Sequence, residues 1–324
     1  MVTRRTLLAL PGAVCVEAIA PARMAFAQSP GTHQFINILT AGTGGIFYPL
    51  GSALAMIIAA KIPGTKPSVQ STRGSVENLN LMEQGKGEVA FVQGDALAFA
   101  WAGNTEAWFK GKQDKVRGIA SLYPSYVQLI AIRESGIRTF NDLKGKRLSV
   151  GAERSGTELT NRTLFKAAGM TYQDLAKIAY RPFEETVDLM KNRELDATLQ
   201  TAGLNVPVIR ELADSFPIVV VEIPPAIVDK IGAPYQRAVI PKGTYRGQVA
   251  DVQAAGLPNF LVTRADMSRE LVYSITKALF ESSAQLAAAH PAAAGINIRQ
   301  ALSGMPVPLH PGAEEYYRGL GLLK

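Results

Sequence analysis

The sequence contains few cysteine, histidine and aromatic residues. Its 324 residues include one cysteine and three histidines, and 7% of them are aromatic. One cysteine excludes a disulfide-stapled scaffold, a zinc finger and an iron–sulfur cluster held by cysteines. The histidines, at positions 33, 290 and 310, form no HExxH motif and no group with metal-ligand spacing. We therefore expect neither a metal nor another cofactor.

Concentrated charge of one sign and long apolar runs are also missing. The chain has 34 Lys and Arg against 27 Asp and Glu, a formal net charge of +7. Its basic residues are scattered rather than arranged in a stripe, so we expect no nucleic-acid partner. Residues 7–20 are mainly apolar but are interrupted by Pro11, Gly12 and Glu17. This stretch falls short of the about 20 residues that cross a bilayer core, so it does not predict a membrane anchor.

Residues 1–27 instead have the pattern of an export signal. Arg4 and Arg5 precede the apolar stretch, and Ala25 and Ala27 supply the small residues of a cleavage site. The segment 3–8 also resembles a twin-arginine signal, so the Sec and twin-arginine routes both stay open. We expect cleavage after Ala27 and a periplasmic location. The mature chain, 28–324, then has no cysteine, because the single one lies in the signal.

The mature chain alternates predicted strands with predicted helices. A strand at 35–39 is followed by a glycine-rich turn and an apolar helix at 47–61. A helix at 75–84, with apolar residues at helical spacing, is followed by a buried strand at 89–93. This alternation predicts an α/β fold with mostly parallel sheets.

Two short segments rich in Pro and Tyr, 123–126 and 232–235, are candidate crossings between two lobes. If they lie side by side, residues 126–233 form an inserted lobe. Residues 28–125 and 234–324 then combine into one discontinuous lobe. Two α/β lobes joined by paired strands form a hinged protein with a ligand cleft between them.

Two turns that open predicted helices are candidate anion sites. The run Gly42-Thr43-Gly44-Gly45 follows a strand, at a place where backbone N–H groups and the helix dipole favour an anion. It matches neither a dinucleotide fingerprint nor a P-loop. Residues 155–157 (Ser-Gly-Thr) occupy the same place in the second predicted lobe. A tight turn without ligand, and simple N-capping at 155–157, are the alternatives.

The remaining motifs give little support for a catalytic site. Ser155 is not the serine of a nucleophile elbow, because Gly151 lies four residues before it rather than two. Glu184 and Glu185 are paired carboxylates, but at a helix start they are better explained as partners of the helix dipole. The segment 93–95 ends a strand where α/β proteins usually bind ligands, with a helix cap by Asp95 as the alternative.

Taken in their order and spacing, these motifs resemble the TAXI family, the solute-binding proteins of one branch of tripartite ATP-independent periplasmic (TRAP) transporters. The resemblance covers essentially the whole mature chain. It rests on residues 42–51, 74–78, 92–95, 142–146, 151–157 and 310–317.

The resemblance implies a two-lobed, type II-like periplasmic-binding-protein fold. It also implies capture of a small carboxylate or amino acid, such as glutamate, and its delivery to the membrane permease subunits of a TRAP transporter. The implied ligand-facing residues are Gly44, Gly45, Tyr48, Ser75, Val76, Gln93, Ser155, Gly156 and Thr157. A short glycine run at 40–45 and the segment 198–201 depart from the family pattern, which leaves the ligand open.

Two other functions stay open at this point. A ligand-binding module that feeds a sensor kinase would use the same cleft. An exported enzyme on the same fold would need a titratable pair or a metal in the cleft, and the motifs supply neither. We therefore expect a binding protein rather than an enzyme.

Overall fold

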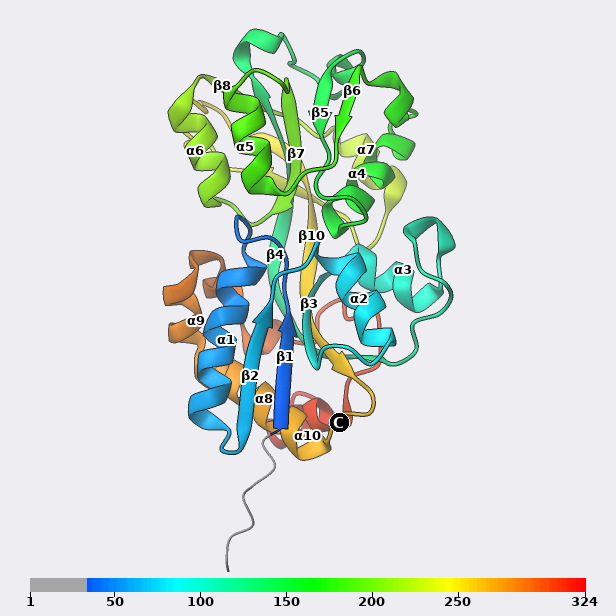
Figure 1. The fold of residues 1–324 in the computed structure, drawn as a ribbon, viewed down its shortest axis with the longest axis vertical. Helices are drawn as coiled ribbons and strands as arrows, with labels where there is room; N and C mark the ends of the chain where they lie inside the picture. The colour runs from blue at the N-terminus through cyan, green and yellow to red at the C-terminus, as the bar shows by residue number, and fades with distance from the viewer. Residues whose placement is uncertain (1–33) are drawn as a thin grey trace, which may run out of the picture. The chain divides into compact units, whose positions relative to one another are not determined.

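The computed structural model describes residues 34–324, so the expected export signal and its cleavage after Ala27 lie outside the described residues. Strands and helices alternate along most of this length (Figure 1). The strands are β1 (Gln34–Leu39), β2 (Thr65–Gln70), β3 (Val89–Gln93), β4 (Val116–Ile132), β5 (Arg147–Ser149), β6 (Lys177–Ala179), β7 (Ala197–Ala202), β8 (Ile218–Val221), β9 (Gln236–Ile240) and β10 (Val252–Arg264). The helices are α1 (Phe47–Lys61), α2 (Ser75–Glu83), α3 (Gly94–Ala102), α4 (Gly156–Ala167), α5 (Phe183–Lys191), α6 (Pro207–Ser215), α7 (Pro225–Ile231), α8 (Arg269–Glu281), α9 (Ser283–Ala289) and α10 (Pro311–Gly319).

The strands pair in the order β2-β1-β3-β10-β4-β7-β5-β6, with β8 beside β4 and β9 beside β10. Pairing is parallel at both ends of this order, and it is antiparallel wherever β4 or β10 takes part. The α/β prediction is confirmed, although the middle of the sheet is antiparallel where mostly parallel pairing was expected. The reason is that two long strands run through the middle against their neighbours.

These two strands connect two lobes (Figure 1). We call the part with β1–β3, α1–α3 and α8–α10 the first lobe, and the part with β5–β8 and α4–α7 the second lobe. The 17 residues of β4 form one continuous strand that runs through the predicted crossing at 123–126. Its Pro124 lies opposite Pro258 of β10, between the two lobes.

The two predicted crossings do not pair directly with each other. Tyr126 lies opposite Gly256, and Gly256 lies opposite Gln236, so β10 lies between them. The segment 232–235 joins α7 to β9. The division into 28–125 plus 234–324 and 126–233 stays a prediction, and the pairing favours a return crossing near Pro258.

Local sequence signals account for several element boundaries. Helix α1 has the predicted bounds, and its buried residues include Leu50, Leu54 and Ile58 at helical spacing. Strand β3 is buried along its whole length, as predicted. Helices α8 and α9 meet at Ser282, which ends the first and precedes the second. Within residues 34–324, none of the helices combines the length and the apolar character needed to cross a membrane.

Candidate ligand-binding site

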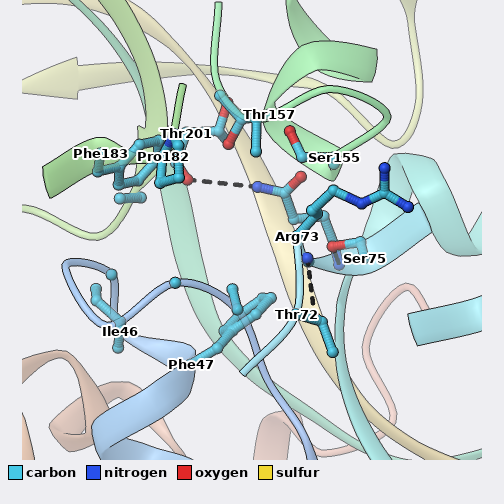
Figure 2. A pocket seen from close by; sticks show the side chains of 18 of the residues that line it. Ile46, Phe47, Thr72, Arg73, Ser75, Ser155, Thr157, Pro182, Phe183 and Thr201 are labelled. Atoms are coloured by element: carbon cyan, nitrogen blue, oxygen red, sulfur yellow. Dashed lines mark hydrogen bonds between the residues drawn. The ribbon is translucent and has the colours of Figure 1, made fainter. Parts of the chain in front are cut away.

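A cavity of about 190 Å³ lies between the two lobes. The first lobe contributes the start of α1, the turn before α2 and the end of β3. The second lobe contributes the starts of α4 and α5 and the end of β7. In Figure 2, Ile46 and Phe47 lie on one side of this space and Thr157 and Thr201 on the other. The cavity is thus enclosed by segments that are far apart in the sequence.

Among the helices that begin at this cavity, α2 and α4 face each other across it. Helix α2 starts at Ser75, after Gly74 at a φ of 108°, and α4 starts at Gly156. The predicted capping role of Ser155 is confirmed, because its Oγ accepts a hydrogen bond of 3.1 Å from the Glu158 N–H. The first N–H groups of a helix have no intrahelical acceptor, and the helix dipole places partial positive charge there. The two starts therefore provide an electropositive wall without a charged side chain.

Gly156 allows the two lobes to approach closely at this wall. A Cβ placed on Gly156 would lie 2.2 Å from Gln93 Oε1 and 2.7 Å from Ser75 Oγ. Gln93 itself is 4% exposed, and its Nε2 donates a hydrogen bond of 3.4 Å to the Thr201 carbonyl across the cleft (Figure 2). Its Oε1 has no hydrogen-bond partner within residues 34–324. One polar side chain thus bridges the lobes, with its amide oxygen packed against Gly156.

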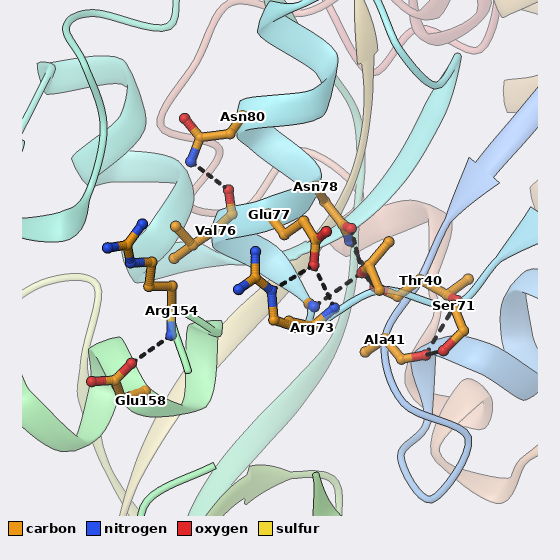
Figure 3. Close-up of polar contacts among 12 residues, drawn as sticks. Thr40, Ala41, Ser71, Arg73, Val76, Glu77, Asn78, Asn80, Arg154 and Glu158 are labelled. Atoms are coloured by element: carbon orange, nitrogen blue, oxygen red, sulfur yellow. Dashed lines mark hydrogen bonds and ion pairs between the residues drawn. The ribbon is translucent and has the colours of Figure 1, made fainter. Parts of the chain in front are cut away.

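A polar network fixes the first-lobe wall (Figure 3). Asn78 donates from Nδ2 to the carbonyls of Thr40, at 2.7 Å, and Phe91, at 2.9 Å. It thereby ties the ends of β1 and β3 to α2, which makes its role structural. Beside it, Arg73 donates from Nε to Glu77 Oε2 at 3.0 Å, and its backbone N–H donates to the same oxygen at 2.8 Å. The only cationic side chain lining the described cavity is therefore paired with a carboxylate outside it.

The glycine run at 42–45 packs against a carboxylate of the second lobe. A Cβ on Gly44 would lie 2.8 Å from Glu184 Oε2 and 3.0 Å from Val208 Cγ1, and one on Gly42 would lie 3.1 Å from Glu184 Oε1. These glycines permit close packing between the lobes. A negative charge beside the run repels a second anion, which disfavours the predicted anion site there.

Six of the nine predicted ligand-facing residues line the cavity, and three do not. Gly44 packs against Glu184, Tyr48 is half-buried on α1, and Val76 is 1% exposed in an apolar core with Leu79. The six that line it are Gly45, Ser75, Gln93, Ser155, Gly156 and Thr157.

Sequence reasoning did not select several other lining residues. Arg73 and Glu184 are the charged ones, and Phe183 and Thr201 face the same space. Glu184 had been explained by the helix dipole alone. Its position in the sequence could have indicated a ligand-facing role, because it lies at a helix start directly after a strand of the second predicted lobe. Ligand sites of α/β proteins form at such places.

Asp95 is a fully buried carboxylate behind the cavity. Its Oδ2 accepts hydrogen bonds of 2.6 Å from Thr160 Oγ1 and from the Tyr235 hydroxyl, and its Oδ1 accepts one of 2.7 Å from the Ala96 N–H. Burial raises the pKa of Asp95 above its usual range, and the two hydroxyl donors oppose that shift. The predicted cap is wrong, because α3 already begins at Gly94 and Asp95 lies inside its first turn. Asp95 instead joins α3, α4 and the segment before β9.

Metal-ligand groups are absent from the part of the chain that the structure describes: no three His, Cys, Asp or Glu residues lie close enough together to hold an ion. His290 and His310 each accept a hydrogen bond from a backbone N–H at the start of a helical turn.

Comparison with known proteins identifies the family. The sequence model of the NMT1-like family matches residues 38–321. The chain belongs to the NMT1-like family. This match does not reach the narrower TAXI subdivision that the motifs resemble.

Solved structures show that this NMT1-like chain has the two-lobed periplasmic-binding-protein fold. The periplasmic binding protein BugD is 11% identical, with a TM-score of 0.56 over 89% of this chain and 94% of that chain. A protein from Bordetella bronchiseptica RB50 is 18% identical, with a TM-score of 0.50 over 90% and 89%. An ancestral arginine-binding protein, solved with arginine, is 16% identical, with a TM-score of 0.50 over 81% and 99%. At these identities the likeness concerns the fold alone, and it confirms the expected fold class.

Proposed function

We propose that this NMT1-like chain is a periplasmic solute-binding protein that captures a small solute between its lobes and delivers it to a membrane permease. The observation that carries the proposal is the cavity at which polar groups of both lobes converge. Its volume of about 190 Å³ lies below the roughly 300–1,000 Å³ of pockets for drug-sized ligands, so a small solute fits it best.

The solute in this proposal carries a carboxylate held by the starts of α2 and α4. First-turn N–H groups and helix dipoles stabilise an anion without a dedicated Arg. In this proposal the ligand carboxylate lies at Ser75, Gly156 and Thr157. It does not lie at the glycine run 42–45, because Glu184 packs against that run. An amino acid or another small carboxylate meets this requirement.

The chemistry of the lining residues supports binding over catalysis. Of the described residues around the cavity, Arg73 and Glu184 carry charge, and Arg73 is paired with Glu77. The hydroxyls of Ser75 and Ser155 accept backbone N–H groups, at 3.0 Å and 3.1 Å, and neither faces a histidine base among the lining residues.

The transport partner rests on the TAXI resemblance, which implies permease subunits of a TRAP transporter. A sensor kinase that reads the same closed lobes is the second candidate. Neighbouring genes separate the two: a large multi-span permease supports transport, and a histidine kinase supports sensing.

Calorimetry on residues 28–324 against a panel of amino acids and small carboxylates tests the binding function. We expect at least one ligand to bind, and Gly156→Ala to weaken it about tenfold or more, because the new Cβ separates the lobes at Gln93 and Ser75. Gly111→Ala is the matched control, since open space surrounds that glycine. Binding of no panel member, or equal affinity in Gly156→Ala, would contradict the proposal.

A further inference from the structure

Glu184 places a carboxylate at the cavity that forms no ion pair with the described residues. Its Oε2 is buried and has no hydrogen-bond partner among the described residues. Its Oε1 accepts one long hydrogen bond, 3.5 Å from Thr43 Oγ1. A carboxylate taken out of water without a cation or good donors is costly, so this geometry calls for a positively charged partner.

The described chain does not supply that partner at the cavity. Among residues 34–324, Arg73 is the one cationic residue that lines the cavity, and its side chain is paired with Glu77. Figure 2 shows Arg73 and Ser75 on one side of the cavity and Pro182 and Phe183, the residues just before Glu184, on the other. The carboxylate of Glu184 packs against Gly42 and Gly44, whereas the start of α4 packs against Gln93 and Ser75 at the start of α2.

A neutral oxygen of the second lobe is also unpaired. Within residues 34–324, Thr201 Oγ1 has no hydrogen-bond partner. An ammonium group has three donors and no acceptor, so it can satisfy a carboxylate and neutral oxygens together. A second carboxylate at this end would be repelled by Glu184.

We propose that Glu184 binds a cationic nitrogen of the ligand and so selects aminocarboxylates over carboxylates that lack nitrogen. The inference rests on the proposed solute-binding function and adds the charge that the second lobe recognises. The ligand carboxylate lies at the starts of α2 and α4, and the ammonium lies beside Glu184 and Thr201. Glu184 is then a specificity-determining residue, and lobe closure brings it to the ligand.

Matched pairs of ligands test this inference by calorimetry on residues 28–324. Each pair differs only in the ammonium group: L-glutamate and glutarate, L-aspartate and succinate, L-leucine and 4-methylpentanoate. We expect the amino member of a pair to bind about 30-fold or more tightly than its partner, as for a close charge pair shielded from water. Glu184→Gln, which keeps the shape and removes the charge, should remove most of that preference.

Glu185→Gln is the matched control, because Glu185 is exposed on the same helix and pairs with Arg181, which precedes that helix. It should keep the affinity and the preference of the unmodified chain. Thermal unfolding of each variant checks that the fold is retained.

The outcomes separate this inference from the proposed function. Equal or tighter binding of the nitrogen-free members, with a gain in Glu184→Gln, would overturn the inference and leave solute binding standing. That result would mean that Glu184 competes with a ligand carboxylate at the glycine run. Binding of no member of either series would overturn the proposed function, and the inference with it.

Discussion

Two histidines show how single residues set helix boundaries in this chain. His310 Nδ1 accepts a hydrogen bond of 3.1 Å from the Gly312 N–H at the start of α10, while its Nε2 lies 3.1 Å from the Met267 carbonyl. This arrangement requires the neutral ring, with the proton on Nε2. Burial is the main cause that lowers the pKa of both His310 and His290 below the ordinary value.

A pH dependence of stability follows from these lowered pKa values. A histidine in the unfolded chain has a pKa of about 6.5, and burial in the fold lowers the pKa of His310 below that value. Protons therefore favour the unfolded chain, so the stabilisation is present above about pH 6.5 and is lost as the pH falls toward the folded pKa. We expect urea unfolding to show lower stability at pH 5 than at pH 7.5. His310→Asn keeps a capping acceptor and does not titrate, so it should reduce this difference, and an unchanged difference would contradict the assignment.

At the scale of elements, α3 of the first lobe and α4 of the second are tied by one buried carboxylate. Asp95 lies two residues after Gln93, and Thr160 lies four residues after Gly156, so both partners follow directly on cavity residues. The hydrogen bonds of Asp95 therefore help to fix the α4 start against the end of β3. A mutation at this tie should change both stability and the cavity.

We expect Asp95→Asn to destabilise the fold by about 1–3 kcal/mol, because Asp95 accepts three hydrogen bonds on two oxygens and an amide has one acceptor oxygen, so its NH2 group would face either the Ala96 N–H or the two hydroxyls. Urea unfolding measures the change. In a double-mutant cycle, Thr160→Val should cost less in the Asp95→Asn background than in the unmodified chain, because the two residues share one hydrogen bond. Strictly additive costs would show that the tie contributes nothing to stability.

At the scale of the whole described molecule, two lobes are linked through the long strands β4 and β10 and meet across the cavity. Contacts at Gly156, Gln93 and Thr201 hold the lobes against each other in this structure. A ligand that touches both lobes stabilises this closed arrangement over an open one. Binding and closure are therefore coupled.

A distance measurement between the lobes tests that coupling. The sequence 28–324 contains no cysteine, so Met56→Cys on α1 and Asp214→Cys on α6 can be labelled selectively. Pulsed electron spin resonance should show a narrower distance distribution with a bound ligand. Adding Gly156→Ala should broaden the distance distribution of the ligand-bound protein and reduce its closed fraction. Identical distributions for the ligand-free protein, the ligand-bound protein and the ligand-bound Gly156→Ala variant would rule out ligand-coupled closure.

The sequence by itself determined the elements whose signals are local. Strand β3 and helix α1 follow from burial pattern and helical spacing, and the Ser155 cap follows from residue type at a helix start. The fold class also follows, because alternating strands and helices have few ways to bury their apolar faces. These properties depend on residues close together in the chain.

Only the tertiary structure decided the partners across the cleft. In the tertiary structure β10 lies between the two expected crossings. Asp95 is buried and accepts hydrogen bonds from Thr160 and Tyr235, and Glu184 packs against Gly44. A helix-start glutamate on the surface and one facing a ligand look alike in sequence, because the difference is what the other lobe brings to it. The charge that the cavity presents to a solute depends on that long-range packing, and local sequence patterns do not encode it.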